Sequence, residues 1–295
     1  SEWLSSLCFR APVVDTVRRD TRVYEAWVSD VETEGNLGVY APDEKKLYVN
    51  STFYFAIGED EQALALDIPN TATMVHELFH AIQQNYDSKT AADWVSEGTA
   101  DAVMLAWMKR QGTEGVKSYS RYYDDPLHKP RSKSHAYYTS LFWLWLGDEL
   151  LSTDQIAYLN KMLNEGEFTQ QDGLKDLQGW LESPEVGNSL YSLFPKFIAQ
   201  KAKFEVMFEN GERSTTIVYR EPEAEKKFTG SVKPLAADPL TVEVKIPAGK
   251  SAELEIKIRP DNSDLHLVVD DQLYAGPALM PDSQAELKPE FRDSY

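Results

Sequence analysis

Cysteine is almost absent from this chain. Cys8 is the single cysteine among 295 residues, so an internal disulfide is excluded. This fits the cytoplasm and equally a bacterial exported protein that does not rely on disulfides. The segment Leu4-Ser5-Ser6-Leu7 precedes Cys8, and a leucine directly before the cysteine is unsuited to a lipidation site.

Long apolar runs are also missing. No stretch reaches the roughly eighteen apolar residues that a membrane-spanning helix needs, and no charged start followed by an apolar stretch marks a signal peptide. We therefore expect no membrane span. The residues by themselves leave the localisation open, and only the family resemblance described below favours a secreted or periplasmic protein.

Basic residues are outnumbered, with 30 Lys and Arg against 48 Asp and Glu and a net charge of −18. A surface of this sign repels phosphates over most of its area, which argues against a nucleic-acid partner. Hydrophobic residues, at 42%, suffice for one large or two ordinary cores in a chain of this length. The composition therefore predicts a folded protein whose acidity serves solubility.

Histidine is scarce as well, yet two of the five histidines stand four apart in His76-Glu77-Leu78-Phe79-His80. On a helix, positions four apart share one face with a rise of about 6 Å, so both imidazoles can be directed at one ion. Imidazole is a good ligand of Zn²⁺, and a catalytic zinc takes three protein ligands and leaves a position for water. Glu77 lies at the edge of the same face, where its carboxylate can act as general base toward that water. The motif predicts a hydrolytic zinc site.

A third ligand is expected from the segment W-V-S-E-G-T-A-D at residues 94–101. Its distance from His80 lets the chain turn and return on a second helix, and Glu97 is the predicted ligand. Asp101 lies four residues further on the same stripe, where it can accept the second N–H of a ligand histidine, and His76 is the expected one. Gly98 costs about 1 kcal/mol relative to alanine in a helix, and a close approach of the two helices at the metal would explain it.

The motifs H-E-L-F-H and S-E-G-T-A-D together resemble the gluzincin metallopeptidases, whose third zinc ligand is a glutamate on the next helix. The resemblance covers roughly residues 70–150. It implies these roles: His76, His80 and Glu97 as zinc ligands, Glu77 as general base, and Asp101 as partner of a ligand. The interval before Glu97 is a little shorter than in thermolysin-like enzymes and zinc aminopeptidases, and no G-A-M-E-N signature precedes the first motif. The chain resembles a less characterised bacterial gluzincin group with a W-x-x-E-G-x-A motif more than either family.

The same resemblance implies a donor that steadies the oxyanion formed in peptide hydrolysis. In gluzincins this donor is a tyrosine or histidine from a later segment. Tyr137, near the start of a helix predicted over 135–147, matches that position best, with Tyr138 and His135 in reserve. The alternative is that these are ordinary half-buried aromatic residues.

The expected fold class is α+β. A zincin-like core, made of a small β-sheet and a helical bundle, is followed by a C-terminal β-sandwich-like module. The predicted catalytic domain spans residues 1–220, with the sheet within 1–70 and the helices within 71–205. A linker is predicted at 221–239 and a β-rich module at 240–295.

Local patterns predict the individual elements. Strands are expected at 22–29, 45–50, 52–57, 240–246, 254–258 and 265–269, with turns at 35–38 and 210–211. Helices are expected from Asn70 or Thr71, just past Pro69, and from Thr90 to Gln111, with Thr90-x-x-Asp93 as capping signal and Gly112 as stop. Later helices are expected from Ser152, around 174–181 and around 190–198. The Tyr-rich basic segment 113–135 is expected to be a rim of the cleft or a solvated connection.

These observations favour a zinc metallopeptidase that acts on a peptide or protein. Two alternatives stay open at this point. One is a catalytically inert binding or scaffold protein on a peptidase-like frame, and the other is a zinc hydrolase of a non-peptide amide or ester. Cleavage specificity and oligomeric state are not indicated by the residues.

Overall fold

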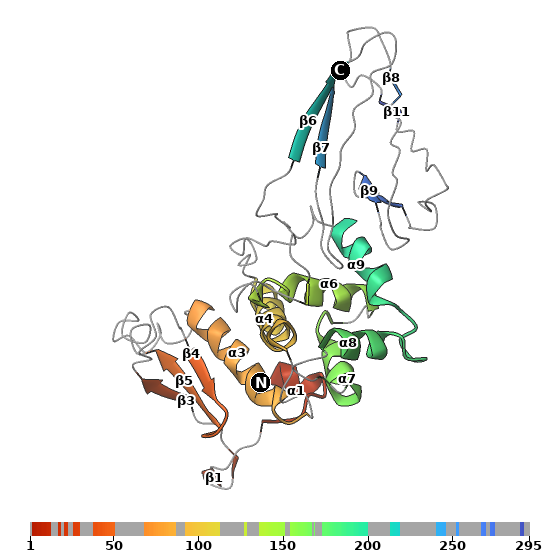
Figure 1. Cartoon of the computed structure of the whole chain (residues 1–295). Helices are drawn as coiled ribbons and strands as arrows, with labels where there is room; N and C mark the ends of the chain where they lie inside the picture. The colour runs from red at the N-terminus through yellow and green to blue at the C-terminus, as the bar shows by residue number, and fades with distance from the viewer. Residues whose placement is uncertain are drawn as a thin grey trace. The chain divides into compact units, whose positions relative to one another are not determined.

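The computed structural model of the chain divides into two compact units, one of residues 1–120 with 128–190 and the other of 121–127 with 191–295 (Figure 1). The residues that the structure describes are 2–12, 17–18, 21–22, 26–29, 38–50, 68–86, 92–112, 127–128, 136–150, 154–166, 168, 173–199, 213–218, 240–245, 252–253, 267–269, 272–274 and 290–291. Within those ranges, no helix is both long and apolar enough to cross a lipid bilayer. The first unit combines a small sheet with several helices, as the α+β prediction expects at this coarse level.

The first unit opens with helix α1 (Glu2–Ser6) and the short antiparallel pair β1 (Val17–Arg18) and β2 (Thr21–Arg22). A three-stranded sheet follows in the order β3-β5-β4, from β3 (Ala26–Ser29), β5 (Lys46–Asn50) and β4 (Gly38–Ala41). Strand β3 runs parallel to β5, and β4 runs antiparallel to it. Leu47 and Val49 are buried while Tyr48 between them is half-buried, so alternation along β5 turns one face of the sheet inward.

Strand β4 is an edge of the sheet among the described residues, and it lies against the following helix, α3 (Ile68–Gln83). Gly38, expected in a turn, is instead the first residue of β4. A Cβ there would lie 3.1 Å from Thr73 Cγ2 and 3.3 Å from Glu77 Cγ. The glycine therefore permits the close approach of β4 to α3 at Thr73 and Glu77.

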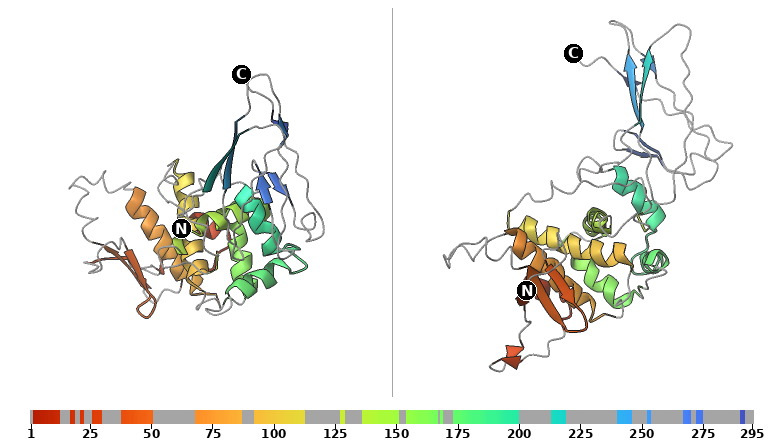
Figure 2. Two further views of the ribbon diagram at one scale, coloured as in Figure 1. Left: turned by 45° about the horizontal axis from the view of Figure 1, so that its top comes forward. Right: turned by 60° about the vertical axis from the view of Figure 1, so that its left-hand side comes forward.

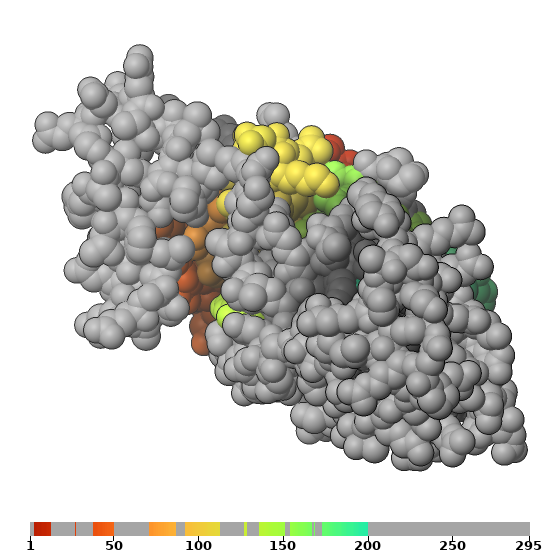
Figure 3. Space-filling model, turned by 90° about the horizontal axis from the view of Figure 1, so that it is seen from above, coloured from red at the N-terminus to blue at the C-terminus, as the bar shows by residue number. Residues whose placement is uncertain are grey.

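Helices α3 and α4 (Asp93–Arg110) lie side by side (Figure 2). Helix α3 begins ahead of Pro69 rather than after it, because a proline in the first turn gives up no helical hydrogen bond. The predicted cap at Thr90 is wrong: the N-cap of α4 is Ala92, whose side chain makes no capping bond. Gly112, with φ of +75°, follows the helix end as predicted, and that exposed end of α4 is visible in Figure 3.

The first unit also contains three later helices: α6 (Ser140–Leu150), α7 (Ala157–Glu165) and α8 (Gly173–Leu181). The apolar run of α6 is buried throughout, including Trp143 and Trp145. Helix α7 has its N-cap at Ile156 without a side-chain cap, so the predicted start at Ser152 is also wrong. Helices whose apolar residues are buried on every side, such as α6, have no polar face to mark their orientation in the sequence.

Gly98 marks a close approach, although not the predicted one. A Cβ at Gly98 would lie 2.0 Å from Thr139 Oγ1 and 2.6 Å from Trp143 Nε1. Both of these groups donate to the carbonyl oxygen of Trp94, at 2.8 and 3.1 Å. The glycine therefore permits the close contact of α4 with the α6 segment. The expectation that it permits a close approach of the two helices at the metal is wrong.

The second unit begins with most of α9 (Leu190–Ala199), which contains Pro195. Its described strands form three pairs: β6 (Arg213–Val218) parallel to β7 (Leu240–Lys245), β9 (Leu267–Val269) antiparallel to β10 (Gln272–Tyr274), and β8 (Ala252–Glu253) antiparallel to β11 (Glu290–Phe291). Strands β7 and β9 fall on predicted alternations, whereas β6 was not predicted. Several predicted segments lie outside the described residues: the linker at 221–239, the strands at 52–57 and 254–258, the turn at 210–211 and most of the segment 113–135.

Candidate metal centre

The paired histidines of α3 and the glutamate of α4 meet where the two helices pack together. His76 and His80 contribute ring nitrogens and Glu97 a carboxylate oxygen, and these ligand atoms all lie within 4.8 Å of one another. Within the described ranges this is the one group of three or more such residues that can hold a metal ion. The segment between the helices thus returns the chain to α3 as its length predicts.

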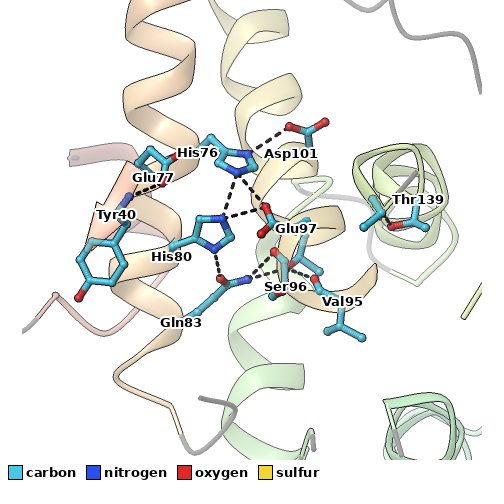
Figure 4. A network of polar contacts seen from close by, with 12 residues as sticks. Tyr40, His76, Glu77, His80, Gln83, Val95, Ser96, Glu97, Asp101 and Thr139 are labelled. Atoms are coloured by element: carbon cyan, nitrogen blue, oxygen red, sulfur yellow. Dashed lines mark hydrogen bonds and ion pairs between the residues drawn. The ribbon is translucent and has the colours of Figure 1, made fainter. Parts of the chain in front are cut away.

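The three ligand atoms form a small triangle (Figure 4). The Nε2 atom of His80 lies 3.0 Å from Nε2 of His76 and 3.2 Å from Oε2 of Glu97. The third side, from His76 Nε2 to Glu97 Oε2, measures 3.3 Å. The two imidazole rings stand nearly perpendicular, at 83°, and both present Nε2 to the shared point.

The other nitrogen of each imidazole is also engaged. Asp101 Oδ1 lies 3.1 Å from His76 Nδ1, and both side chains are buried, at 3% and 6% exposure. This is the contact that the spacing of Glu97 and Asp101 predicts. His80 Nδ1 lies 2.7 Å from Gln83 Oε1, a partner that was not predicted from the sequence. The sequence does contain a signal for this contact, because a residue three positions after His80 lies on the same face of the helix.

Histidines and carboxylates at the centre shift one another's pKa values. Burial lowers the pKa of His76, but hydrogen bonds to Asp101 and Glu97 outweigh it and raise the value to about 10. Burial raises the pKa of Glu97, and its hydrogen bonds to His76 and His80 overcome this and hold that pKa well below the ordinary range. The centre therefore favours positive charge at its middle, and Glu97 is an anion at neutral pH.

Glu77 is held from the sheet. Its Oε2 accepts a hydrogen bond from the backbone N–H of Tyr40 in β4, at 2.8 Å (Figure 4). The hydroxyl of Tyr40 donates to Gln84 Oε1 at 2.7 Å, so Tyr40 joins strand β4 both to α3 and to the residue just past the end of α3. Glu77 itself is largely buried. Its carboxylate therefore lies on the β4 side of α3, beside the ligand histidines.

Tyr137 lies just before α6 and next to the ligands. Its ring centroid is 5.7 Å from that of His76. Burial, the nearby carboxylates of Glu97, Asp101 and Glu77, and a hydrogen bond to Glu97 all raise the pKa of Tyr137, so its hydroxyl keeps its proton. Tyr138 follows it and is half-buried, while His135 lies outside the described residues.

No protein-family model, curated protein or solved structure matches this chain. The side chains of the centre and their geometry are therefore what indicates a function.

Proposed function

We propose that this chain is a zinc-dependent metallopeptidase of the gluzincin type, in which His76, His80 and Glu97 hold the ion. One observation carries the proposal: their three ligand atoms are 3.0, 3.2 and 3.3 Å apart. Tetrahedral zinc with ligands at about 2.0–2.1 Å separates neighbouring ligand atoms by about 3.3 Å. The triangle thus has nearly the size of one face of a zinc tetrahedron, which leaves the fourth position for water or substrate.

The hydrogen-bond partners of the two imidazoles support the same assignment. Both Nδ1 atoms are engaged by neighbouring side chains, so both imidazoles offer Nε2 toward Glu97. One carboxylate and two imidazoles are a donor set that suits zinc. Zinc bound there would lower the pKa of a coordinated water to about 7 and polarise the carbonyl of a substrate.

Glu77 is the proposed general base. Its carboxylate takes the proton of the attacking water and delivers it to the nitrogen of the leaving amine. The Tyr40 N–H holds Oε2 at 2.8 Å, which limits rotation of the carboxylate about its own axis. Tyr137, whose hydroxyl keeps its proton, is the proposed donor to the oxyanion.

The proposed substrate is a peptide in an extended conformation. Support comes from β4, which is an edge strand among the described residues and lies beside the helix that carries the ligands. An extended peptide can add to such an edge through main-chain hydrogen bonds. A zincin-like core for the first unit and a β-sandwich-like C-terminal module belong to the same proposal.

The direct test compares the wild type with Glu77→Gln and His80→Ala, using metal analysis and a diverse peptide pool with and without chelator. Glu77→Gln should bind one zinc per chain and lose hydrolysis by about a factor of 10² to 10⁴, because the amide cannot accept the proton. His80→Ala should lose the metal. Full activity in Glu77→Gln would disprove the mechanism. A zinc-loaded wild type that cleaves no peptide would instead favour an inert scaffold or a hydrolase of other amides or esters.

A further inference from the structure

Gln83 is a buried polar residue that the proposed chemistry does not use. Its side chain is at the C-terminal end of α3, where the residue is 8% exposed, and every polar atom of its amide has a partner. The oxygen Oε1 lies 2.7 Å from His80 Nδ1. The nitrogen Nε2 donates to the backbone oxygen of Ser96 at 3.0 Å and to Thr99 Oγ1 at 2.8 Å. One amide thus joins a ligand histidine to two residues of α4.

These partners fix which way the amide points. A backbone carbonyl such as that of Ser96 can only accept a hydrogen bond. The hydroxyl of Thr99 donates its own proton to the Val95 carbonyl, at 2.7 Å, so toward Gln83 it too is an acceptor. The amide nitrogen must therefore face α4, and the amide oxygen must face His80. A flipped amide would set its oxygen against two acceptors and leave both of its N–H groups without those partners.

The orientation of the amide determines the tautomer of His80. Because Oε1 can only accept, Nδ1 of His80 has to carry the hydrogen, and the lone pair of the neutral ring is then on Nε2. Nε2 is the atom that lies 3.0 Å from His76 Nε2 and 3.2 Å from Glu97 Oε2. The Ser96 carbonyl that Gln83 also binds belongs to the residue next to Glu97. The same side chain therefore acts on two of the three ligands.

We propose that Gln83 is the positioning residue of this centre: it holds His80 as the Nδ1–H tautomer with Nε2 toward the ion, and it fixes the backbone of α4 beside Glu97. This inference rests on the proposed metal site. The two histidines are supported differently, since His76 has the carboxylate of Asp101 and His80 a neutral amide. The neutral group avoids adding another negative charge to a centre that already contains Glu97, Asp101 and Glu77.

The test uses ¹⁵N-labelled histidine NMR on the zinc-loaded wild type, together with zinc affinity from chelator competition. The expected spectrum assigns the hydrogen of His80 to Nδ1 and the metal to Nε2. Ligation of His80 through Nδ1 would overturn the proposal, and this result needs no variant to fold.

Three variants separate positioning from simple packing. Gln83→Met keeps the volume but no hydrogen bond, and should weaken zinc binding about ten- to a hundredfold with loss of the protected His80 Nδ1–H signal. Gln83→Glu keeps an acceptor for that hydrogen and should restore the signal. The matched control is Thr99→Val, which removes one bond on the far side of the same amide and should leave the His80 signal and most of the affinity in place.

Wild-type zinc affinity and an unchanged Nδ1–H signal in Gln83→Met would reduce Gln83 to a packing residue. Failure of the Gln83 proposal can be told apart from failure of the proposed peptidase function. A protein that binds zinc through His80 Nε2 but cleaves no peptide would contradict the peptidase and leave the role of Gln83 standing, whereas a protein that binds no zinc would contradict both.

Discussion

At the scale of single residues, the proposed general base is positioned by a backbone group of another element. Tyr40 gives its N–H to Glu77 at 2.8 Å and therefore does not give it to the neighbouring strand β5. A proline is tolerated on an edge strand where no ladder hydrogen bond is lost. Tyr40 is thus a position at which an N–H can be deleted without breaking the sheet.

We expect Tyr40→Pro to lower kcat about ten- to a hundredfold below Tyr40→Ala, because hydrogen bonds to charged groups contribute about 1.5–3 kcal/mol. Tyr40→Ala is the matched control, since it removes the same side chain and keeps the N–H. Steady-state kinetics and metal analysis check this, with KM and zinc content expected to be similar in the two variants. Equal kcat values would show that the backbone bond does not position Glu77.

Tyr137→Phe tests the proposed oxyanion donor. Removing one such donor typically costs about 10²- to 10³-fold in kcat, while zinc stays bound because His76, His80 and Glu97 are untouched. Tyr138→Phe is the comparison, and it should have the smaller effect. A larger loss in Tyr138→Phe would move the donor role to that reserve residue.

The site residues differ in how far the sequence could identify them. The pairs His76/His80 and Glu97/Asp101 each follow from helical periodicity, which is local. The pairing of Glu97 with the histidines depends on the length of the segment between the helices and on the family resemblance, and the structure brings all four residues together. Gln83 obeys the same periodicity and could have been found. Tyr40 could not, because its role depends on which strand packs against α3 and on which side of that strand its N–H points.

At the scale of elements, the contact of α4 with the α6 segment depends on Gly98, which has no side chain. We expect Gly98→Ala to destabilise the protein by about 1–3 kcal/mol, the usual cost of overpacking, since the new methyl group would meet Thr139 Oγ1 and Trp143 Nε1. Urea unfolding measures this. Gly179→Ala on α8 is the control: nothing lies within 4 Å of its Cβ, and helix propensity alone predicts a gain of up to about 1 kcal/mol. Equal effects of the two substitutions would contradict this account.

In the first unit the helices were predictable, and β3 and β5 lie within the predicted strands 22–29 and 45–50. The helix starts and strand β4 were not predictable. The capping signals at Thr90 and Ser152 are local, yet the N-caps are Ala92 and Ile156, whose side chains cap nothing. Burial of the apolar residues decides these starts. Strand β4 has four residues and begins with a glycine, so no alternation could reveal it before its place against α3 was known.

At the scale of the whole molecule, all tryptophans report on one unit. The seven residues are Trp3, Trp27, Trp94, Trp107, Trp143, Trp145 and Trp180, and every one lies within the first compact unit. Tryptophan fluorescence therefore follows the unfolding of the unit that contains the candidate metal centre.

We expect zinc to stabilise this unit selectively. A metal at a hundred times its Kd adds about 2.7 kcal/mol to the free energy of unfolding, so chelator should lower the midpoint of the fluorescence-detected transition. His80→Ala should show the lower midpoint with or without zinc. A wild-type midpoint that does not respond to zinc or chelator would contradict metal binding in this unit.

On the proposed function, the hydrogen bond between Tyr40 and Glu77 also constrains where a substrate peptide can bind along the edge of β4. A peptide that extends the sheet at β4 finds the Tyr40 amide already occupied by the base. Its next partner on the same side of the strand is Gly38, two positions away. This one occupied amide would thus fix the register of such a peptide on β4, and with it the peptide bond that is presented to the proposed ion.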